Sequence, residues 1–198
     1  ELPQEKLDIK TPLPILALLP GSRTQELKHL LPVMIETAKS LPQFQAIVAG
    51  APGQDSSAYT MAEEAGIPVV FNQTRLILRN STVGLVTSGT ATLEASLLEL
   101  PHIICYKTSG LTYRIAKLVS KVQWIGLPNL ILNKLAVPER IQSDCNAAAL
   151  RRDIQGLFEG QKLTKTGLKQ KLLAESLKAA LGEESAASNT AASIMEQL

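Results

Sequence analysis

The chain is poor in several features that mark specialised classes of protein. Aromatic residues make up only 4% of its 198 residues and charged residues 19%, whereas 45% are hydrophobic. A disordered tail has much less apolar material, so that class is excluded. Twelve Gly and eleven Pro are an ordinary share, which excludes a collagen-like fibre. The length suits one good hydrophobic core or two small ones, and it is short for a two-domain enzyme.

A surplus of one charge sign is also missing. Lys and Arg number 20 against 18 for Asp and Glu, which leaves a net charge of +2. A nucleic-acid-binding domain carries a stronger basic surface than this, so we expect no nucleic-acid partner.

Cysteine is scarce, and the spacing of Cys105 and Cys145 matches neither a zinc site nor a disulfide framework. We expect two buried thiols in a reducing compartment. The sequence has no cluster of carboxylates or of His and Cys ligands, so we predict no metal ion and no other cofactor.

Long apolar runs are absent. No run approaches the roughly 18 residues that a membrane span needs, and no signal-peptide pattern opens the chain. We therefore expect a soluble, cytoplasmic protein. The chain begins at Glu1 rather than Met, as a piece cut from a longer protein would.

What the sequence does contain is an alternation of short apolar runs with helical patterns. The expected strands are 15–19, 46–49, 67–71, 83–87, 102–106 and a last short one at 123–126. The expected helices are 27–35, 57–65, 75–80, 91–100 and 111–122, and then 147–158, 165–181 and 186–198. This order predicts an α/β fold with a doubly wound, mainly parallel, Rossmann-like sheet. We divide it into a sheet domain at 13–160 and C-terminal helices at 161–198.

Two junctions between a strand and a helix stand out, because ligands of such sheets bind beyond the carboxyl ends of the strands. At the first junction, Gly21 lets the backbone approach a ligand, Ser22 starts a helix and Arg23 adds a charge, which suits a phosphate. The alternative is a plain turn in which Ser22 caps the helix, in a capping box with Gln25, and Arg23 is solvated.

The second junction places Ser88, Gly89, Thr90 and Ala91 at a helix start, where free N–H groups favour an anion. Glu94 lies one turn further, where its carboxylate either favours the helix dipole or accepts hydrogen bonds from a ribose. The dinucleotide pattern G-x-G-x-x-G and the P-loop pattern are both absent, which excludes NAD-binding and P-loop enzymes. One sheet with two such junctions suits a nucleoside diphosphate.

At this point the chain resembles the lipid-A-disaccharide synthases. The resemblance extends over about 16–142 and rests on five motifs in register: Leu-Leu-Pro-Gly-Ser-Arg at 18–23 with Glu26, Ser-Gly-Thr-Ala-Thr-Leu-Glu at 88–94, Pro101 with Tyr106-Lys107, Leu-Pro-Asn at 127–129, and Pro138-Glu139 with Gln142.

The resemblance implies one half of an inverting glycosyltransferase with two Rossmann-like domains. That family transfers 2,3-diacylglucosamine from UDP to 2,3-diacylglucosamine 1-phosphate and releases UDP. The motifs belong to its C-terminal, nucleotide-binding half. The catalytic base, an Asp of an N-terminal domain, would be missing here, so this chain has no predicted catalytic residue and should be inactive alone. His29 and His102 are not expected to replace that base.

The resemblance also assigns roles to residues. The predicted diphosphate contacts are Gly21, Ser22 and Arg23, with Ser88, Gly89, Thr90 and Ala91 as helix-start amides and Glu94 at the ribose. Asn129, Glu139 and Gln142 would line the sugar-diphosphate side, and 72–74 the uracil.

Two surfaces remain open to alternatives. Arg114, Lys117 and Lys121 share one face of the 111–122 helix, with Trp124 nearby, so this helix either lies at an anionic membrane or packs its apolar face on the sheet. The Leu-rich stripe at 168–181 either packs on the domain or faces the missing N-terminal domain or a second subunit, as in a homodimer.

Two other functions remain as alternatives to this glycosyltransferase interpretation. The first is another UDP-N-acetylglucosamine enzyme of the same fold, a 2-epimerase or a peptidoglycan-precursor glycosyltransferase. The second is a UDP-binding module without catalysis.

Overall fold

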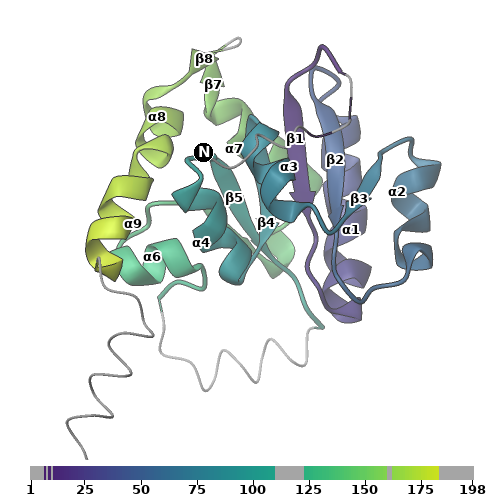
Figure 1. The fold of residues 1–198 in the computed structure, drawn as a ribbon, viewed down its shortest axis with the longest axis horizontal. Helices are drawn as coiled ribbons and strands as arrows, with labels where there is room; N and C mark the ends of the chain where they lie inside the picture. The colour runs from purple at the N-terminus through teal and green to yellow at the C-terminus, as the bar shows by residue number, and fades with distance from the viewer. Residues whose placement is uncertain (1–6, 8, 10, 110–122, 160–161, 183–198) are drawn as a thin grey trace, which may run out of the picture.

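The computed structural model describes residues 7, 9, 11–109, 123–159 and 162–182. Its centre is a six-stranded sheet in which every neighbouring pair is parallel and the order is β3-β2-β1-β4-β5-β6. Figure 1 labels the first five of these strands. The strands are β1 (Ile15–Leu19), β2 (Gln45–Gly50), β3 (Val69–Phe71), β4 (Val83–Thr87), β5 (His102–Tyr106) and β6 (Glu139–Ile141). The predicted doubly wound, Rossmann-like fold is confirmed.

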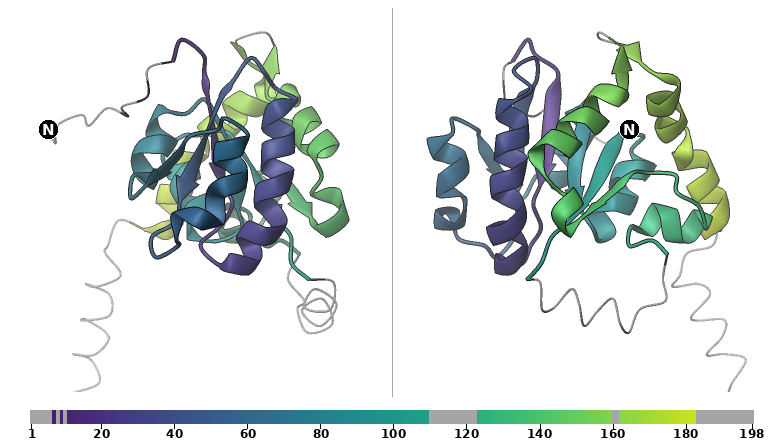
Figure 2. Two further views of the ribbon diagram at one scale, coloured as in Figure 1. Left: turned by 90° about the vertical axis from the view of Figure 1, so that its right-hand side faces the viewer. Right: turned by 180° about the vertical axis from the view of Figure 1, so that it is seen from behind.

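Helices cover both faces of this sheet. Helices α3 and α4 lie in front of it in Figure 1, and α1 and α7 cover the opposite face in the right-hand view of Figure 2. The helical elements are α1 (Thr24–Lys39), η1 (Ser56–Tyr59), α2 (Thr60–Glu64), α3 (Thr74–Asn80), α4 (Thr90–Leu97), α6 (Leu127–Leu132), η2 (Gln142–Asp144), α7 (Ala147–Gly156), α8 (Lys165–Lys171) and α9 (Leu173–Leu181). Among the described residues, no helix is long and apolar enough to span a membrane.

The continuous apolar run of β1 is explained by burial on both of its faces. Leu16 and Leu18 pack with α1, whereas Ala17 and Leu19 pack with residues of α3 and α4. A parallel strand between two helical layers has no polar face, so its sequence does not alternate.

The short strand expected at 123–126 is wrong. The backbone N–H groups of Ile125 and Gly126 donate to the Glu139 carboxylate, so they are not free for a strand ladder. The sixth strand is β6, which pairs with β5 and is tied to α7 by the Arg140–Asp153 ion pair, with Nε and Oδ2 2.6 Å apart.

The C-terminal part also differs from the expected long helices. The helix predicted at 147–158 ends at Gly156 and is followed by a hairpin of β7 (Phe158–Glu159) and β8 (Lys162–Leu163). The helix predicted at 165–181 is divided at Leu172 into α8 and α9. The expected helices at 111–122 and 186–198 lie outside the described residues.

The leucine stripe of the last two helices is divided between core and surface. Leu173 and Leu177 pack with Ile104 of β5, whereas Leu168 and Leu172 are exposed. Helix α9 therefore packs on the sheet domain, beside α4 and α6. The domain boundary at 160 remains a prediction.

Candidate functional site

The carboxyl ends of parallel strands meet at one edge of the sheet. Strands β1 and β4 are neighbours, and Leu19 lies opposite Val86 in their register. The two junctions selected from the sequence, 20–23 after β1 and 88–91 after β4, therefore begin side by side. The loops after β5 and β6 follow along the same edge.

The first junction is organised by Glu26 rather than by Ser22. One oxygen of its carboxylate accepts the backbone N–H of Ser22 at 3.0 Å and that of Arg23 at 3.2 Å. Arg23 is the N-cap residue of α1, so the capping box expected between Ser22 and Gln25 is wrong. These two amides are occupied. The Arg23 side chain is 83% exposed and forms an ion pair with the Glu26 carboxylate, with Nη1 and Oε1 3.6 Å apart.

Gly21 is required by this turn. Its φ of +110° is unfavourable for residues with a side chain, and a Cβ here would collide with the Glu26 carboxylate. Gln54 supports the turn from the loop after β2, because its Nε2 donates to the carbonyl of Ser22 at 2.8 Å. Gln54 was not predicted from the sequence, since only the fold brings it near.

The second junction leaves its helix start open. Gly89, with φ +156°, is the N-cap of α4, and no side chain of the described residues caps that helix. The first-turn N–H groups of Thr90 and Ala91 therefore have no partner within the helix. Glu94, one turn further, is half-buried. This end of α4 has the partial positive charge and the N–H groups that an anion needs.

Ser88 is used differently from the expected ligand contact. Its N–H donates to the Cys105 carbonyl at 2.9 Å, and its hydroxyl donates to the Ile125 carbonyl at 2.8 Å. Ser88 thus joins the start of α4 to the segment before α6. The adjacent Thr87 hydroxyl is buried without a hydrogen-bond partner in the described part of the chain.

Asn129 and Glu139 face each other beneath that segment. Asn129 is fully buried; its Oδ1 accepts the N–H groups of Ala136 and Val137, both at 2.8 Å, and its Nδ2 donates to the Val137 carbonyl and to Glu139. The polar atoms of Asn129 are therefore engaged by protein groups.

Gln142 holds the loop after β5. Its Oε1 accepts the Thr108 N–H at 2.9 Å and its Nε2 donates to the Thr108 carbonyl at 3.2 Å. Gln142 itself has a positive φ of 53°. A non-glycine residue in this conformation is uncommon and costs free energy, which the pair of hydrogen bonds offsets.

The two thiols, predicted to be buried, are buried and hydrogen-bonded to each other. This hydrogen bond, together with burial, raises the pKa of Cys105. The same hydrogen bond lowers the pKa of Cys145, and the Lys107 ammonium acts in the same direction. The ammonium also donates to the Cys145 carbonyl at 3.1 Å.

The two histidines lie away from the open end of α4. His29 is half-buried on α1. His102 begins β5 and so lies at the opposite edge of the sheet, 1% exposed; its Nδ1 donates to the Leu100 carbonyl at 2.8 Å, and burial lowers its pKa to about 4.

Other predicted positions are spread more widely. Asn72 and Gln73 follow β3, which is separated from β4 by two strands, and both are exposed. Trp124 is half-buried, whereas Arg114, Lys117 and Lys121 lie outside the described residues. Within the described part of the chain, no group of His, Cys, Asp and Glu side chains is arranged to hold a metal ion.

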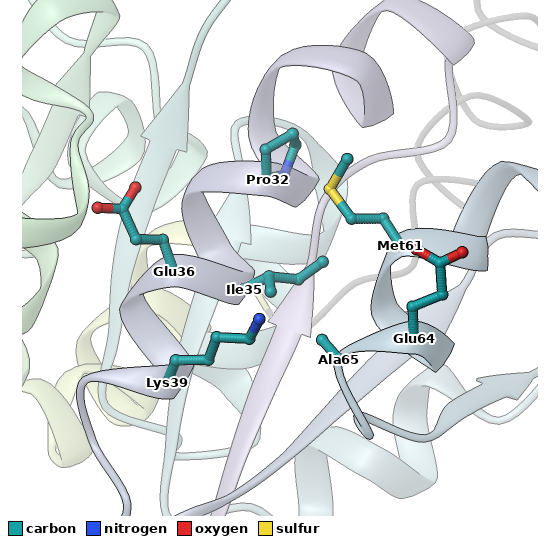
Figure 3. A pocket seen from close by; sticks show the side chains of 7 residues that line it. All are labelled: Pro32, Ile35, Glu36, Lys39, Met61, Glu64 and Ala65. Atoms are coloured by element: carbon teal, nitrogen blue, oxygen red, sulfur yellow. The ribbon is translucent and has the colours of Figure 1, made fainter.

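An open groove of about 440 Å³ lies elsewhere, between α1 and α2. Pro32, Ile35 and Met61 turn toward one another across it (Figure 3). It is lined by Pro32, Ile35, Glu36, Lys39, Met61, Glu64 and Ala65. None of the residues selected from the sequence contributes to this groove.

Comparison with known proteins identifies relatives of the chain. Residues 1–195 match the family model of lipid-A-disaccharide synthetase. Lipid-A-disaccharide synthase 1 of Legionella pneumophila (strain Philadelphia 1) is 38% identical over 164 residues, 79% of this chain and 43% of the relative. Lipid-A-disaccharide synthase of Myxococcus xanthus is 34% identical over 202 aligned positions, 98% of this chain and 52% of the relative. The chain spans about half the length of these relatives.

The fold is also found in a solved structure. The glycotransferase of kitacinnamycin superposes with a TM-score of 0.59 at 13% identity, over 100% of this chain and 46% of the other. At this level of identity the likeness concerns the fold alone.

Proposed function

Because the chain belongs to the lipid-A-disaccharide synthetase family, we propose that it forms the C-terminal, UDP-sugar-binding half of an inverting glycosyltransferase. The observation that carries this proposal is the pairing of an uncapped helix start at Gly89 with an exposed guanidinium at Arg23, on neighbouring strand ends. The proposed donor is UDP-2,3-diacylglucosamine and the proposed acceptor 2,3-diacylglucosamine 1-phosphate, as the family's reaction implies.

In this proposal the diphosphate of the donor lies against the first turn of α4. The N–H groups of Thr90 and Ala91 donate to one phosphate, and the helix dipole favours its charge. Arg23 reaches the diphosphate from the adjacent junction, and Glu94 accepts hydrogen bonds from the ribose hydroxyls. Asn72 to Thr74 remain candidates for contacts with the uracil.

The transfer itself makes two chemical demands. The acceptor hydroxyl attacks the anomeric carbon as the bond to UDP breaks, so its proton must pass to a base and the departing UDP keeps the electron pair. Arg23 and the α4 start would stabilise that anionic leaving group. The carboxylates of Glu26 and Glu139 are occupied by backbone N–H groups, and we therefore assign the base to the part of the relatives that this chain does not span.

The proposal for the sugar-diphosphate side is more limited. Asn129 is buried, and its hydrogen bonds, like those of Gln142, run to protein groups. We propose that these two residues, with Glu139, shape that side of the site without touching the sugar.

The other proposed partners are a lipid surface and a further part of the protein. Trp124 with Arg114, Lys117 and Lys121 would face the anionic cytoplasmic side of the inner membrane, where both lipid substrates reside. The exposed Leu168 on α8 offers apolar surface to the N-terminal half of the enzyme or to a second copy in a homodimer.

Calorimetric titration with UDP tests the nucleotide site. We expect the chain to bind UDP weakly and to show no transferase turnover alone. Arg23→Ala should weaken binding at least about tenfold, because a charge-assisted hydrogen bond contributes about 1.5–3 kcal/mol. Glu94→Ala should also weaken binding, because it removes the proposed acceptor of the ribose hydroxyls.

The matched control for the arginine is Arg79→Ala, at the exposed C-terminal end of α3 and at the opposite edge of the sheet. It should leave UDP affinity unchanged. Equal losses from Arg23→Ala and Arg79→Ala, or no binding by the unmodified chain, would contradict the proposed site.

A further inference from the structure

The Glu139 side chain is the centre of a hydrogen-bond cluster whose donors, among the described residues, are uncharged. Its Oε1 accepts from the Gly126 N–H at 2.9 Å and from Asn129 Nδ2 at 2.8 Å, and its Oε2 accepts from the Ile125 N–H at 3.0 Å. Such bonds to a carboxylate are stronger than those between neutral groups and fix the direction of each donor. Glu139 thus fixes the backbone at residues 125 and 126.

The same peptide backbone is held from its other side by the proposed nucleotide site. The Ile125 carbonyl accepts the Ser88 hydroxyl at 2.8 Å. Residue 125 therefore connects two side chains, with its N–H on Glu139 and its C=O on Ser88. Ser88 immediately precedes Gly89, which starts α4.

Two further contacts restrict movement of this connection. Asn129 holds Glu139 in place, and it is itself bonded to the backbone of Val137, two residues before Glu139. Gly126 packs so closely on Ile104 of β5 that a Cβ at position 126 would collide with it. The segment is thus fixed against the sheet on one side and against Glu139 on the other.

We propose that Glu139 is a positioning residue of the nucleotide site, which orients the Ser88–Gly89 turn through the backbone of Ile125. This inference rests on the proposed function, because it assigns the turn to diphosphate binding. Two hydrogen bonds, one on each side of Ile125, separate Glu139 from Ser88, and Glu139 itself touches neither phosphate nor sugar.

The first test is made without ligand. In amide NMR spectra, Glu139→Gln should speed hydrogen exchange at Ile125 and Gly126 and shift the Ser88 and Gly89 resonances, because the new amide group presents a donor where N–H groups need an acceptor. The control is Glu159→Gln, at an exposed position in β7, which should leave these four signals unchanged.

The second test is a double-mutant cycle on UDP affinity. As a single substitution, Glu139→Gln should weaken UDP binding about tenfold, as expected for the loss of a charged acceptor. In a chain that carries Ser88→Ala the same substitution should cost much less, since the link to the turn is already cut.

The outcomes separate this inference from the proposed function. The positioning role would be overturned if the Ser88 and Gly89 signals were unchanged in Glu139→Gln. It would also be overturned if the fold loss of UDP affinity in the double variant equalled the product of the losses in the two single variants. If Glu139→Gln does not fold, Ser88→Ala tests the same connection from the Ser88 side. This variant should shift the amide signals of Ile125 and Gly126, and unchanged signals would overturn the positioning role. Failure of the unmodified chain to bind UDP, with the NMR coupling present, would reject the proposed function alone.

Discussion

Gly21 is subject to two constraints, one on its backbone conformation and one on the space beside its Cα. Its backbone has a φ of +110°, and the space that a Cβ would take is filled by the Glu26 carboxylate. Gly53 shares the positive φ, at +81°, but nothing lies within 4 Å of its Cβ position. Substitutions at Gly21 and Gly53 therefore separate the free-energy cost of a positive φ from the cost of a collision between a Cβ and the Glu26 carboxylate.

Gly53→Ala should therefore lower the free energy of unfolding by about 1 kcal/mol, the cost of a left-handed conformation. Gly21→Ala should cost more, about 2–3 kcal/mol, because the carboxylate must also leave the Ser22 and Arg23 amides. Urea denaturation of the two variants measures the difference. Equal losses would mean that Glu26 moves aside freely.

His102 makes stability depend on pH. Burial lowers its pKa from 6.5 to about 4 in the folded chain, so the unfolded chain binds a proton more readily between these values. The contribution to stability is complete above about pH 6.5 and is lost as the pH falls towards 4. Over this window it amounts to at most about 3 kcal/mol.

The matched variant is His102→Asn, which does not titrate and keeps a donor near the Leu100 carbonyl. Urea unfolding at pH 7, 5.5 and 4.5 should show a smaller pH dependence for the variant than for the unmodified chain. Parallel curves for the two proteins would contradict a neutral, buried imidazole.

At this scale the sequence predicted local features better than hydrogen-bond partners. The burial of both cysteines and the helix start at Gly89 could be predicted from local patterns. The role of Glu26 could not, because Ser22 with Gln25 matches a capping box equally well, and only the actual start of α1 decides between them. Glu139 was found by resemblance, but its bonds to residues 125 and 126 depend on folding.

Among the elements, β6 shows most clearly why a strand was missed in the sequence. Its three residues, Glu139–Ile141, are too few for a recognisable apolar run, and Arg140 in the middle is charged. The strand forms because β5 offers a free edge and because Arg140 pairs with Asp153 on α7. Both causes are tertiary, and neither is visible in local periodicity.

Helix α9 provides a direct comparison of two leucines. Leu177 is fully buried, whereas Leu181 on the same helix is 49% exposed. Leu177→Ala should lower the free energy of unfolding by about 2–5 kcal/mol, since a cavity is left. Leu181→Ala should cost less than about 1 kcal/mol. Thermal or urea unfolding of both variants measures the difference, and a larger loss for Leu181→Ala than for Leu177→Ala would contradict the packing of α9 through Leu177.

For the whole molecule, the fold was more predictable than the site. Alternating apolar runs and helical patterns specify a parallel sheet with helices on both faces, since a strand such as Ile15–Leu19 must be buried twice. The sheet order then brings the ends of β1 and β4 together. Which amides there are occupied depends on single side chains, and this detail lies beyond a pattern of residue types.

The proposed membrane contact is tested at the scale of the whole surface. Replacing Arg114, Lys117 and Lys121 together by Glu should weaken binding to vesicles of anionic lipid at least about tenfold, because each basic residue near such a surface contributes about 1 kcal/mol. Cosedimentation with anionic and with neutral vesicles measures the effect.

The control for that experiment makes the same change of charge on α8. Lys165, Lys169 and Lys171 are all exposed there, and their replacement by Glu should have a smaller effect. An equal loss from both triple variants would attribute vesicle binding to net charge rather than to the predicted membrane face.

The shortness of the two outermost strands has a consequence for behaviour at high concentration. Strands β3 and β6 have three residues each, and Pro68 and Pro138 stand directly before them. Proline lacks an N–H group, and three residues offer few backbone groups to an incoming strand. The sheet therefore presents poor templates for edge-to-edge growth, which protects this parallel fold from aggregation into extended fibres.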